Sequence, residues 1–319
     1  MRVLAFVLSA PFIELAALFL SILWMLRNPK DKVRPLLVIA LIVNLFYGIL
    51  LSMFMGAEGS LLPWKYDFIL LHLDTALGLP ATRLAQPLEG EWRIPLMTVY
   101  QLMIPMMICW FLVVRRRGLG PALILAYVAE LVTGPLLYAI VPACGPGYAL
   151  GADWMHAAPP AQELIRLGGM PNAFPSLHIG TALVLVLFAP GRWSRIIALA
   201  FFAATGMAIV STGEHYVIDL LPGLAFGCFA AEAGLRRYKP ALANLALALL
   251  WSFLVRFEYP FFISHPYALR ILAFVTVLAT ATTVAQEWRK REGRGAEDRS
   301  GDRGGSAPEQ PTPVHMPSP

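Results

Sequence analysis

The sequence contains few charged residues. Asp, Glu, Lys and Arg make up only 14% of its 319 residues, whereas a soluble domain has about 25%. Hydrophobic residues make up 58%, and the mean hydropathy is +0.64. So little charge cannot cover the surface of a water-soluble protein of this length. The composition therefore excludes an ordinary soluble enzyme and predicts an integral membrane protein.

Cysteine is also scarce, with three residues in the chain. Cys109 and Cys228 lie in predicted spans and only Cys144 lies in a predicted outer loop, so we expect no disulfide framework. No cluster of Cys, His and carboxylate residues completes a ligand set, which argues against a metal site. The net charge of +5 needs no nucleic-acid partner, because most basic residues flank apolar runs, where anionic lipid explains them.

Long apolar runs fill most of the sequence instead. A membrane-spanning helix needs roughly 20 mostly apolar residues. The N-terminal run is too long for the apolar part of a signal peptide and lacks a small-residue cleavage site, so we interpret it as a span. The sequence predicts nine spans, at 3–26, 35–55, 94–114, 119–142, 176–190, 195–212, 216–235, 241–263 and 267–286. The predicted fold class is an all-α, polytopic transmembrane helical bundle, in which the run 176–190 is short for a span.

Basic residues alternate along the connections between these spans. Every second connection is rich in Lys and Arg, and so is the segment after the last span, whereas the intervening connections are poorer in both. Lys and Arg in short loops mark the cytoplasmic side. The pattern therefore predicts an N-terminus outside and a C-terminus in the cytoplasm. The basic clusters are Arg27 to Arg34, Arg115 to Arg117, Arg192 with Arg195, Arg236 to Lys239, and Arg289 to Arg291.

The first long outer segment contains an amphipathic stretch. Asp67, Leu70, Leu71 and Asp74 follow a helical period. Amphipathic helices of this kind often lie flat in the membrane interface. We therefore expect an interfacial helix here.

Two histidines lie at the outer ends of predicted spans. His178 begins the span 176–190, and His215 stands at the start of the span 216–235, with Asp219 four residues later. Both spans run inward from the outer side, so the two histidines are expected at the same depth. Placing an ionisable residue within or beside a membrane span costs free energy, so such residues usually have a function. This pair is therefore a candidate site.

The residue types at these positions suggest acid–base and nucleophilic chemistry. Residues i and i+4 share a helix face, so Asp219 can accept a hydrogen bond from His215 and leave the other ring nitrogen free as a base or nucleophile. His178 can then act as a general acid. Ser211 and Glu214 have capping-box spacing, which predicts a helix that starts just before His215.

A second helix start is predicted at the other histidine. Pro175 and Ser176 suit the beginning of the helix that carries His178. Two helix N-termini would then point at one place, and backbone N–H groups with the helix dipoles make such a place attractive to phosphate. The sequence thus predicts an anion site with two histidines within reach.

Other interpretations of the same residues stay open. A lone histidine at an interface is usually structural, and this applies to His72, His156 and His265. Paired helix histidines can also bind haem axially, and a lipid-binding or transport protein without chemistry could keep the same arrangement. Gly223 and Gly227 form a small-xxx-small pair, which is typical of helix packing.

The two motifs together resemble the type 2 phosphatidic acid phosphatase superfamily. They read FPSLHIG at 174–180 and GEHYVID at 213–219. The sequence looks closest to the branch that includes inositol phosphorylceramide synthases and sphingomyelin synthases, and the loop at 144–147 loosely resembles an upstream motif of that branch. The resemblance covers about 94–235, and it implies a six-helix phosphatase-like core.

The resemblance implies roles for the residues of the motifs. His215 would attack phosphorus and form a phosphohistidine, Asp219 would orient it, and His178 would protonate the leaving oxygen. Ser176 would hold a phosphate oxygen. No metal or other cofactor is implied. The further candidate substrate-binding residues are Arg166, Asn172 and Tyr216.

Two departures from the phosphatases of this superfamily concern phosphate-holding cations. The Lys-x6-Arg-Pro motif is missing, because the spacing from Lys30 to Arg34 is too short and that loop faces the cytoplasm. The Arg expected six residues before the nucleophilic histidine is Ile209. Arg166 is the best substitute on the outer face, and Lys65 is a weaker one. The transferase branch shares this absence.

The chain is therefore expected to form one membrane domain with four parts. Residues 1–93 form N-terminal spans and the outer interfacial segment, 94–235 the phosphotransferase-like core, and 236–291 two further spans. The segment 292–319 is rich in Gly, Pro and charge, which predicts a disordered cytoplasmic tail.

The predicted function is a metal-independent lipid phosphotransferase. It would move a phosphate-linked head group between lipids at the outer face, from a phosphorylated lipid to a lipid hydroxyl. Release of phosphate to water by a lipid phosphate phosphatase is the alternative reaction, and a non-catalytic lipid-binding or transport protein is the alternative outside enzymes. The sequence does not name the lipid.

Overall fold

The structure is a computed structural model. It describes residues 55–157 and 160–301, together with Leu23, Arg27 and Met53, and the side chains up to Glu292. The predicted spans 3–26 and 35–55 therefore lie outside the described residues, apart from isolated positions.

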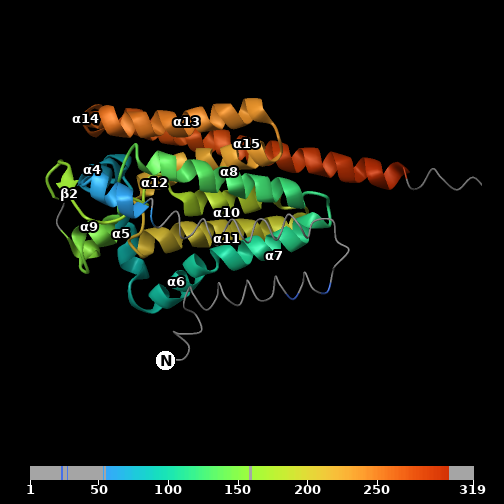
Figure 1. Cartoon of the computed structure of the whole chain (residues 1–319), viewed down its shortest axis with the longest axis horizontal. Helices are drawn as coiled ribbons and strands as arrows, with labels where there is room; N and C mark the ends of the chain where they lie inside the picture. Colours follow the sequence, from blue (N-terminus) through green and yellow to red (C-terminus); the bar gives the residue numbers. More distant parts are fainter. Residues whose placement is uncertain (1–22, 24–26, 28–52, 54, 158–159, 302–319) are drawn as a thin grey trace, which may run out of the picture.

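Long helices packed side by side form the body of the chain (Figure 1). Five are long and apolar enough to cross a membrane, and α6 with α7 adds a sixth candidate, bent by 49° at the break. This confirms the predicted all-α, polytopic membrane fold, whereas the number of nine spans stays a prediction. The five are α8 (Gly120–Tyr138), α11 (Arg192–Ser211), α12 (Val217–Gly234), α13 (Tyr238–Phe257) and α15 (Pro266–Gly301), and the bent pair joins α6 (Arg93–Gln101) to α7 (Met103–Arg115).

The short predicted span corresponds to a central helix. α10 (Leu177–Phe188) has 12 residues, which gives it a length of about 18 Å. Its residues from Ile179 to Phe188 are all buried, and it packs against α7, α8, α11 and α12. A helix enclosed by other helices does not have to match the thickness of the lipid by itself, which explains why its apolar run is short.

The helices α10 and α12 approach each other through glycines. A Cβ atom added to Gly227 would lie 2.6 Å from the carbonyl oxygen of Gly180, and one added to Gly223 would lie 2.6 Å from that of Ser176. Only glycine leaves room for backbones this close. The packing role predicted for the pair of glycines in α12 is confirmed.

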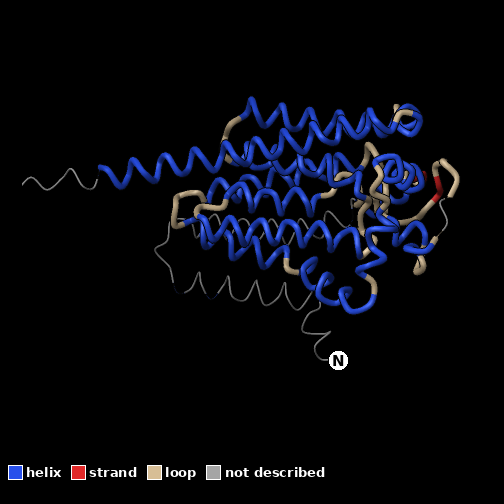
Figure 2. Tube along the Cα trace, turned by 180° about the vertical axis from the view of Figure 1, so that it is seen from behind, coloured by secondary structure: helices blue, strands red, loops and turns tan. Residues whose placement is uncertain are grey.

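Short elements cover one end of the bundle (Figures 1 and 2). Residues Trp64–Lys65 (β1) pair antiparallel with Ile165–Arg166 (β2), so that Trp64 lies opposite Arg166. This is the end at which α10 and α12 begin. The other elements are α4 (Asp67–Leu77), α5 (Ala81–Ala85), η1 (Gln86–Leu88), η2 (Gly90–Trp92), α9 (Pro146–Leu150), η3 (Trp154–His156) and α14 (Tyr259–Ser264).

The amphipathic stretch of the outer segment forms α4, as its helical period predicts. That this helix lies flat in the interface stays a prediction, but its acids do not face water as those of an amphipathic interfacial helix would. Asp67 and Asp74 are fully buried, as are Ile69 and Leu70, and the helix packs against α12, α14 and α15. The reason is that both carboxylates accept hydrogen bonds from buried backbone groups, so they face protein instead of water.

The last helix is longer than predicted. α15 continues to Gly301, ten residues into the segment 292–319 that was expected to be disordered. Extending an existing helix by one residue is far easier than nucleating a new one, so a helix that begins in a span can run on into a polar segment. The remainder, 302–319, lies outside the described residues.

Candidate functional site

The starts of α10 and α12 are joined by their backbones. The N–H of Ser176 donates to the carbonyl oxygen of Asp219 at 3.0 Å. Ser176 is the N-cap of α10, and its Oγ accepts a hydrogen bond from the N–H of Ile179 at 3.4 Å. The predicted helix start at Ser176 is thus confirmed. These contacts place the two sequence motifs side by side.

The two candidate histidines meet at this junction. The ring centroids of His178 and His215 are 5.7 Å apart, with the planes inclined by 68°. Tyr100, near the end of α6, stacks on His178 with a centroid distance of 4.5 Å. Only 2% of His215 is exposed. The fold therefore forms the histidine pair that the sequence predicted and adds an aromatic side chain that fixes one ring.

A backbone carbonyl sets the orientation of His215. Its Nδ1 lies 2.7 Å from the carbonyl oxygen of Ala173, and because a carbonyl only accepts, Nδ1 must carry the proton. The neutral ring then keeps a free lone pair on Nε2. Asp219 was predicted as the orienting partner, but its Oδ2 is 3.5 Å from Nδ1 and accepts the N–H of Tyr216 at 2.8 Å. Asp219 thus places a carboxyl group near Nδ1, and Ala173 supplies the hydrogen bond.

The predicted capping box before His215 does not form. Ser211 is the last residue of α11, and its hydroxyl donates to the carbonyl oxygen of Ala208 at 3.0 Å. The next helix, α12, begins only at Val217, so His215 lies in the loop between the two helices. The serine satisfies a carbonyl at the end of one helix instead of an N–H group at the start of the next.

A carboxylate from another helix caps α12 in its place. Asp74 of α4 accepts the N–H of Ile218 at 2.7 Å on one oxygen. On the other oxygen it accepts the N–H of Val217 at 2.9 Å and that of Ala81 at 3.2 Å. Unpaired N–H groups at a helix start need such acceptors, and a negative charge there also matches the helix dipole. Asp74 therefore holds the first turn of α12 in place.

The second carboxylate of α4 holds the neighbouring loop. Asp67 Oδ1 accepts the N–H of Gly145 at 2.8 Å, the N–H of Cys144 at 3.0 Å and the hydroxyl of Tyr216 at 3.2 Å. Desolvation raises the pKa of Asp67 to about 7, although these hydrogen bonds and Lys65 lower it. Gly145 has φ of +93°, a conformation that favours glycine. The loop and the residue after His215 thus share one buried anchor.

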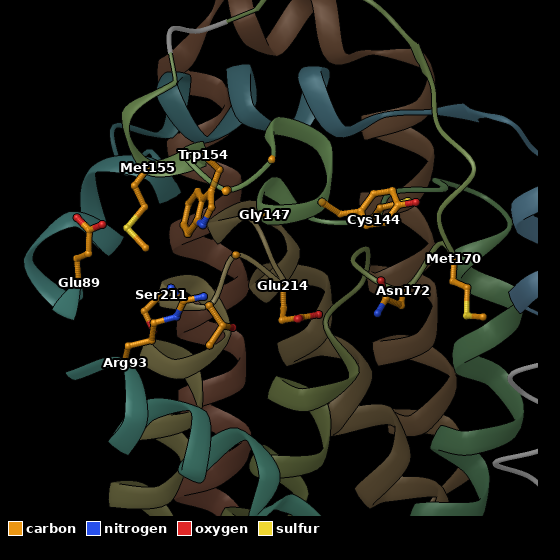
Figure 3. Close-up of a pocket in the computed structure, with 15 residues that line it drawn as sticks. Glu89, Arg93, Cys144, Gly147, Trp154, Met155, Met170, Asn172, Ser211 and Glu214 are labelled. Atoms are coloured by element: carbon orange, nitrogen blue, oxygen red, sulfur yellow. The ribbon is translucent and has the colours of Figure 1, made fainter. Parts of the chain in front are cut away.

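A pocket of about 470 Å³ is lined by segments that adjoin His215 in the chain, although neither histidine of the pair is among the lining residues (Figure 3). Its wall includes Asn172, the residue before Ala173, and the loop from Ser211 to Glu214, which leads into His215. Arg93 and Glu89 contribute further charged groups to the lining. The pocket is therefore next to the site and is lined by polar groups as well as by apolar ones.

A family model described as the PAP2 superfamily matches residues 68–233. The chain belongs to the PAP2 superfamily. Membership places it among lipid phosphatases and phosphotransferases, and the apolar helices make it an integral membrane protein. No curated protein and no solved structure matches the chain. The likeness to the inositol phosphorylceramide synthase branch stays a prediction.

The matched region of this PAP2 chain begins earlier than the resemblance in the motifs. It starts at residue 68, instead of at about 94, and so it includes nearly all of α4. Both carboxylates of α4 contact the site segments directly. Sequence reasoning missed their role because their partners in the site segments lie 77 to 149 residues away along the chain. The available signal was two acids seven residues apart in an otherwise apolar stretch.

The remaining predicted site residues of the PAP2 chain fall into two groups. Asn172 lines the pocket, and Ser176 is a fully buried helix cap. The side chain of Tyr216 is fully buried and its hydroxyl is bound to Asp67, so it supports the site and does not face the pocket. Arg166 is exposed on β2 and is not among the pocket residues.

Lys65, the second cation proposed from the sequence, is held by a contact within its own segment. The side chain of Lys65 is buried, and its Nζ donates to the carbonyl oxygen of Leu62. Desolvation lowers the pKa of Lys65, while the nearby Cys144 and Asp67 raise it. Within the part of the chain that the structure describes, no group of three or more His, Cys, Asp or Glu side chains could hold a metal ion.

Proposed function

We propose that this PAP2 protein transfers a phosphate-linked group from a phosphorylated lipid to the hydroxyl of a second lipid, through a covalent intermediate on His215. The observation that carries the proposal is the hydrogen bond of 2.7 Å from His215 Nδ1 to the carbonyl of Ala173. That bond fixes the tautomer whose Nε2 lone pair is free to attack phosphorus. The proposed metal-independent chemistry uses only side chains of the site.

In the first step Nε2 of His215 forms a bond to phosphorus as the bond from phosphorus to the leaving oxygen breaks. His178, whose ring centroid is 5.7 Å away, donates a proton to that oxygen. A bound phosphate anion favours the protonated form of His178, because an opposite charge stabilises the imidazolium. Asp219, 3.5 Å from Nδ1, stabilises the positive charge that develops on the phosphorylated ring.

In the second step the acceptor hydroxyl attacks phosphorus, and the bond from phosphorus to Nε2 breaks. The neutral His178 now takes the proton from the hydroxyl, which restores both histidines. Two hydroxyl sources are chemically equivalent here. A lipid alcohol gives head-group transfer, and water gives hydrolysis.

One observation favours the hydrolytic alternative. The pocket beside His215 is lined partly by polar groups, including Glu214 and Asn172, so water can approach the intermediate from that side. We keep transfer as the main proposal because the two cations of the phosphatase motifs are missing, as in the synthase branch that the sequence resembles. The substrate is a phosphorylated lipid in both cases.

The first prediction concerns the covalent intermediate. Purified protein in EDTA is mixed with a lipid donor labelled on phosphorus and quenched, and the label on the protein, free phosphate and transferred head group are measured. The wild type should carry label, and His215→Ala should lose both the label and at least about 1,000-fold of the turnover. His265→Ala is the matched control, because this exposed histidine directly follows α14, outside the pair.

Each outcome of that experiment has a distinct meaning. Label and head-group transfer without free phosphate would support the synthase reaction, and label with phosphate release would support the phosphatase. Activity that survives in His215→Ala, or that EDTA abolishes, would contradict the proposed mechanism. A folded wild type without any turnover on a panel of phosphorylated lipids would favour the non-catalytic lipid-binding protein.

A further inference from the structure

The pocket beside the histidine pair contains one basic side chain. Among the described residues that line it, Arg93 is the only Lys, Arg or His. The phosphatase motifs of the superfamily would supply two cations, and neither stands at its usual place in this chain. A phosphate group bound between the histidines needs a counter-charge, because the other charged side chains that line the adjoining pocket, Glu89 and Glu214, are acidic.

The position of Arg93 is fixed relative to the pair by its own helix. Arg93 and Tyr100 lie seven residues apart in α6, which corresponds to two turns, so they share a face about 10 Å apart along the axis. Tyr100 stacks directly on His178, and α6 packs against α11. The face of α6 that carries Arg93 is therefore the face that contacts the site.

The guanidinium of Arg93 is available for a ligand. The residue is exposed, and no described residue forms an ion pair with it. The carboxylate of Glu89, which also lines the pocket, lies 3.2 Å from His156. Figure 3 shows the side chain of Arg93 extended toward Ser211 and the interior of the pocket. A free, planar guanidinium is well suited to bind two phosphate oxygens at once.

We propose that Arg93 is the phosphate-holding cation of this site. The ligand class is the phosphate mono- or diester of a lipid head group, whose non-bridging oxygens Arg93 binds from the pocket side while Nε2 of His215 attacks phosphorus. The role of Arg93 during the transfer reaction rests on the proposed function. The binding of phosphate by Arg93 does not depend on it. Arg166, the substitute predicted from the sequence, is instead exposed on β2 opposite Trp64.

The test compares arginine variants in two measurements. One is kcat/KM on the best phosphorylated lipid found for the wild type. The other is the rise of Tm in detergent caused by inorganic phosphate, relative to chloride at equal ionic strength. The variants are Arg93→Ala, Arg93→Lys, Arg166→Ala and the control Arg83→Ala, an exposed arginine of α5 at the same end of the bundle that does not line the pocket.

We expect Arg93→Ala to lower kcat/KM by about 10- to 100-fold, the usual loss for a charged hydrogen-bond partner. The same variant should lose the stabilisation by phosphate. Arg93→Lys should recover part of both, because it restores the charge but not the two-pronged geometry. Arg83→Ala should stay within about twofold of the wild type, since it only removes an exposed surface charge.

The outcomes separate this inference from the proposed function. If His215→Ala is inactive while Arg93→Ala behaves like Arg83→Ala in both measurements, the transfer mechanism stands and the role of Arg93 is wrong. If turnover does not depend on His215 but phosphate stabilises only proteins that retain Arg93, the binding site stands without the mechanism. A large loss in Arg166→Ala alone would assign the role to that residue and overturn ours.

Discussion

At the scale of single residues, the position of the nucleophilic loop depends on Asp74. This side chain is fully buried in α4 and accepts three backbone N–H groups, two of which belong to the first turn of α12. His215 lies just before that turn, and Asp219 lies within it. A shift of the helix start would therefore move the two groups of the site relative to His178.

We predict that Asp74→Ala lowers both stability and turnover. The change leaves three backbone N–H groups without an acceptor, two of them on buried residues, which should cost roughly 2–4 kcal/mol of the free energy of unfolding. The start of α12 then loosens, so kcat should fall at least about tenfold while KM changes little, because Asp74 touches no substrate group. Thermal unfolding in detergent and steady-state kinetics on a phosphorylated lipid measure the two effects.

Two variants control this prediction. Asp74→Asn keeps the shape and one acceptor oxygen, so its losses should be intermediate. Thr75→Ala changes an exposed neighbour in the same helix whose hydroxyl only donates to the carbonyl of Leu71, and it should have little effect. Equal behaviour of Asp74→Ala and Thr75→Ala would show that α12 is positioned without the cap from α4.

At the scale of elements, the site depends on the close contact between α10 and α12. Gly223 lies against the carbonyl oxygen of Ser176, two residues before His178. Gly227 repeats the contact one turn further into the membrane, at Gly180. The distance between these two helices therefore sets the distance between the histidines.

We predict that Gly223→Ala reduces turnover by pushing the start of α10 away from α12. The new methyl group would meet backbone at 2.6 Å, a contact that cannot be relieved by turning a side chain, and overpacking of this kind costs about 1–3 kcal/mol. Gly206→Ala in α11 is the matched control, since its methyl group would meet Ile179 Cδ1 at an ordinary 3.6 Å. That change should leave activity intact and Tm equal or slightly higher, because alanine favours helix. Unchanged activity in Gly223→Ala would show that the site tolerates separation of the helices.

How much of this could be predicted from sequence depends on the range of each interaction. The apolar runs that form α8, α11, α12, α13 and α15 could be predicted, because hydropathy is a local property of the sequence. The pairing of His178 with His215 was readable because alternating spans put both at one depth. The partner of His215 was not, because the acceptor is the backbone carbonyl of Ala173, a group that every residue carries. The burial of α4 was equally hidden, since its acids bind backbone far away in the chain.

At the scale of the whole molecule, the pocket and the described basic residues around Arg195 and Arg237 lie at opposite ends of the bundle. α11 runs from Arg192 to Ser211, which lines the pocket. Its 20 residues span about 30 Å, close to the thickness of the hydrocarbon core. Near the basic end, Arg195 pairs with Glu292 of α15 and Arg237 pairs with Glu287. The two ends of one helix thus separate the candidate site from the basic residues by about one membrane thickness.

The positive-inside rule turns this separation into a prediction of which side the site faces. Two cysteine variants are made after the native cysteines have been replaced. Asp153→Cys lies exposed at the pocket end, and Tyr238→Cys lies exposed among the basic residues at the start of α13. A membrane-impermeant maleimide should label Asp153→Cys on intact cells and Tyr238→Cys only after permeabilisation. The opposite pattern would place the site on the cytoplasmic side. The donor and acceptor lipids would then have to come from the inner leaflet, whereas the predicted pattern requires both in the outer leaflet, because the pocket residues lie at the end of α11 opposite to its basic end.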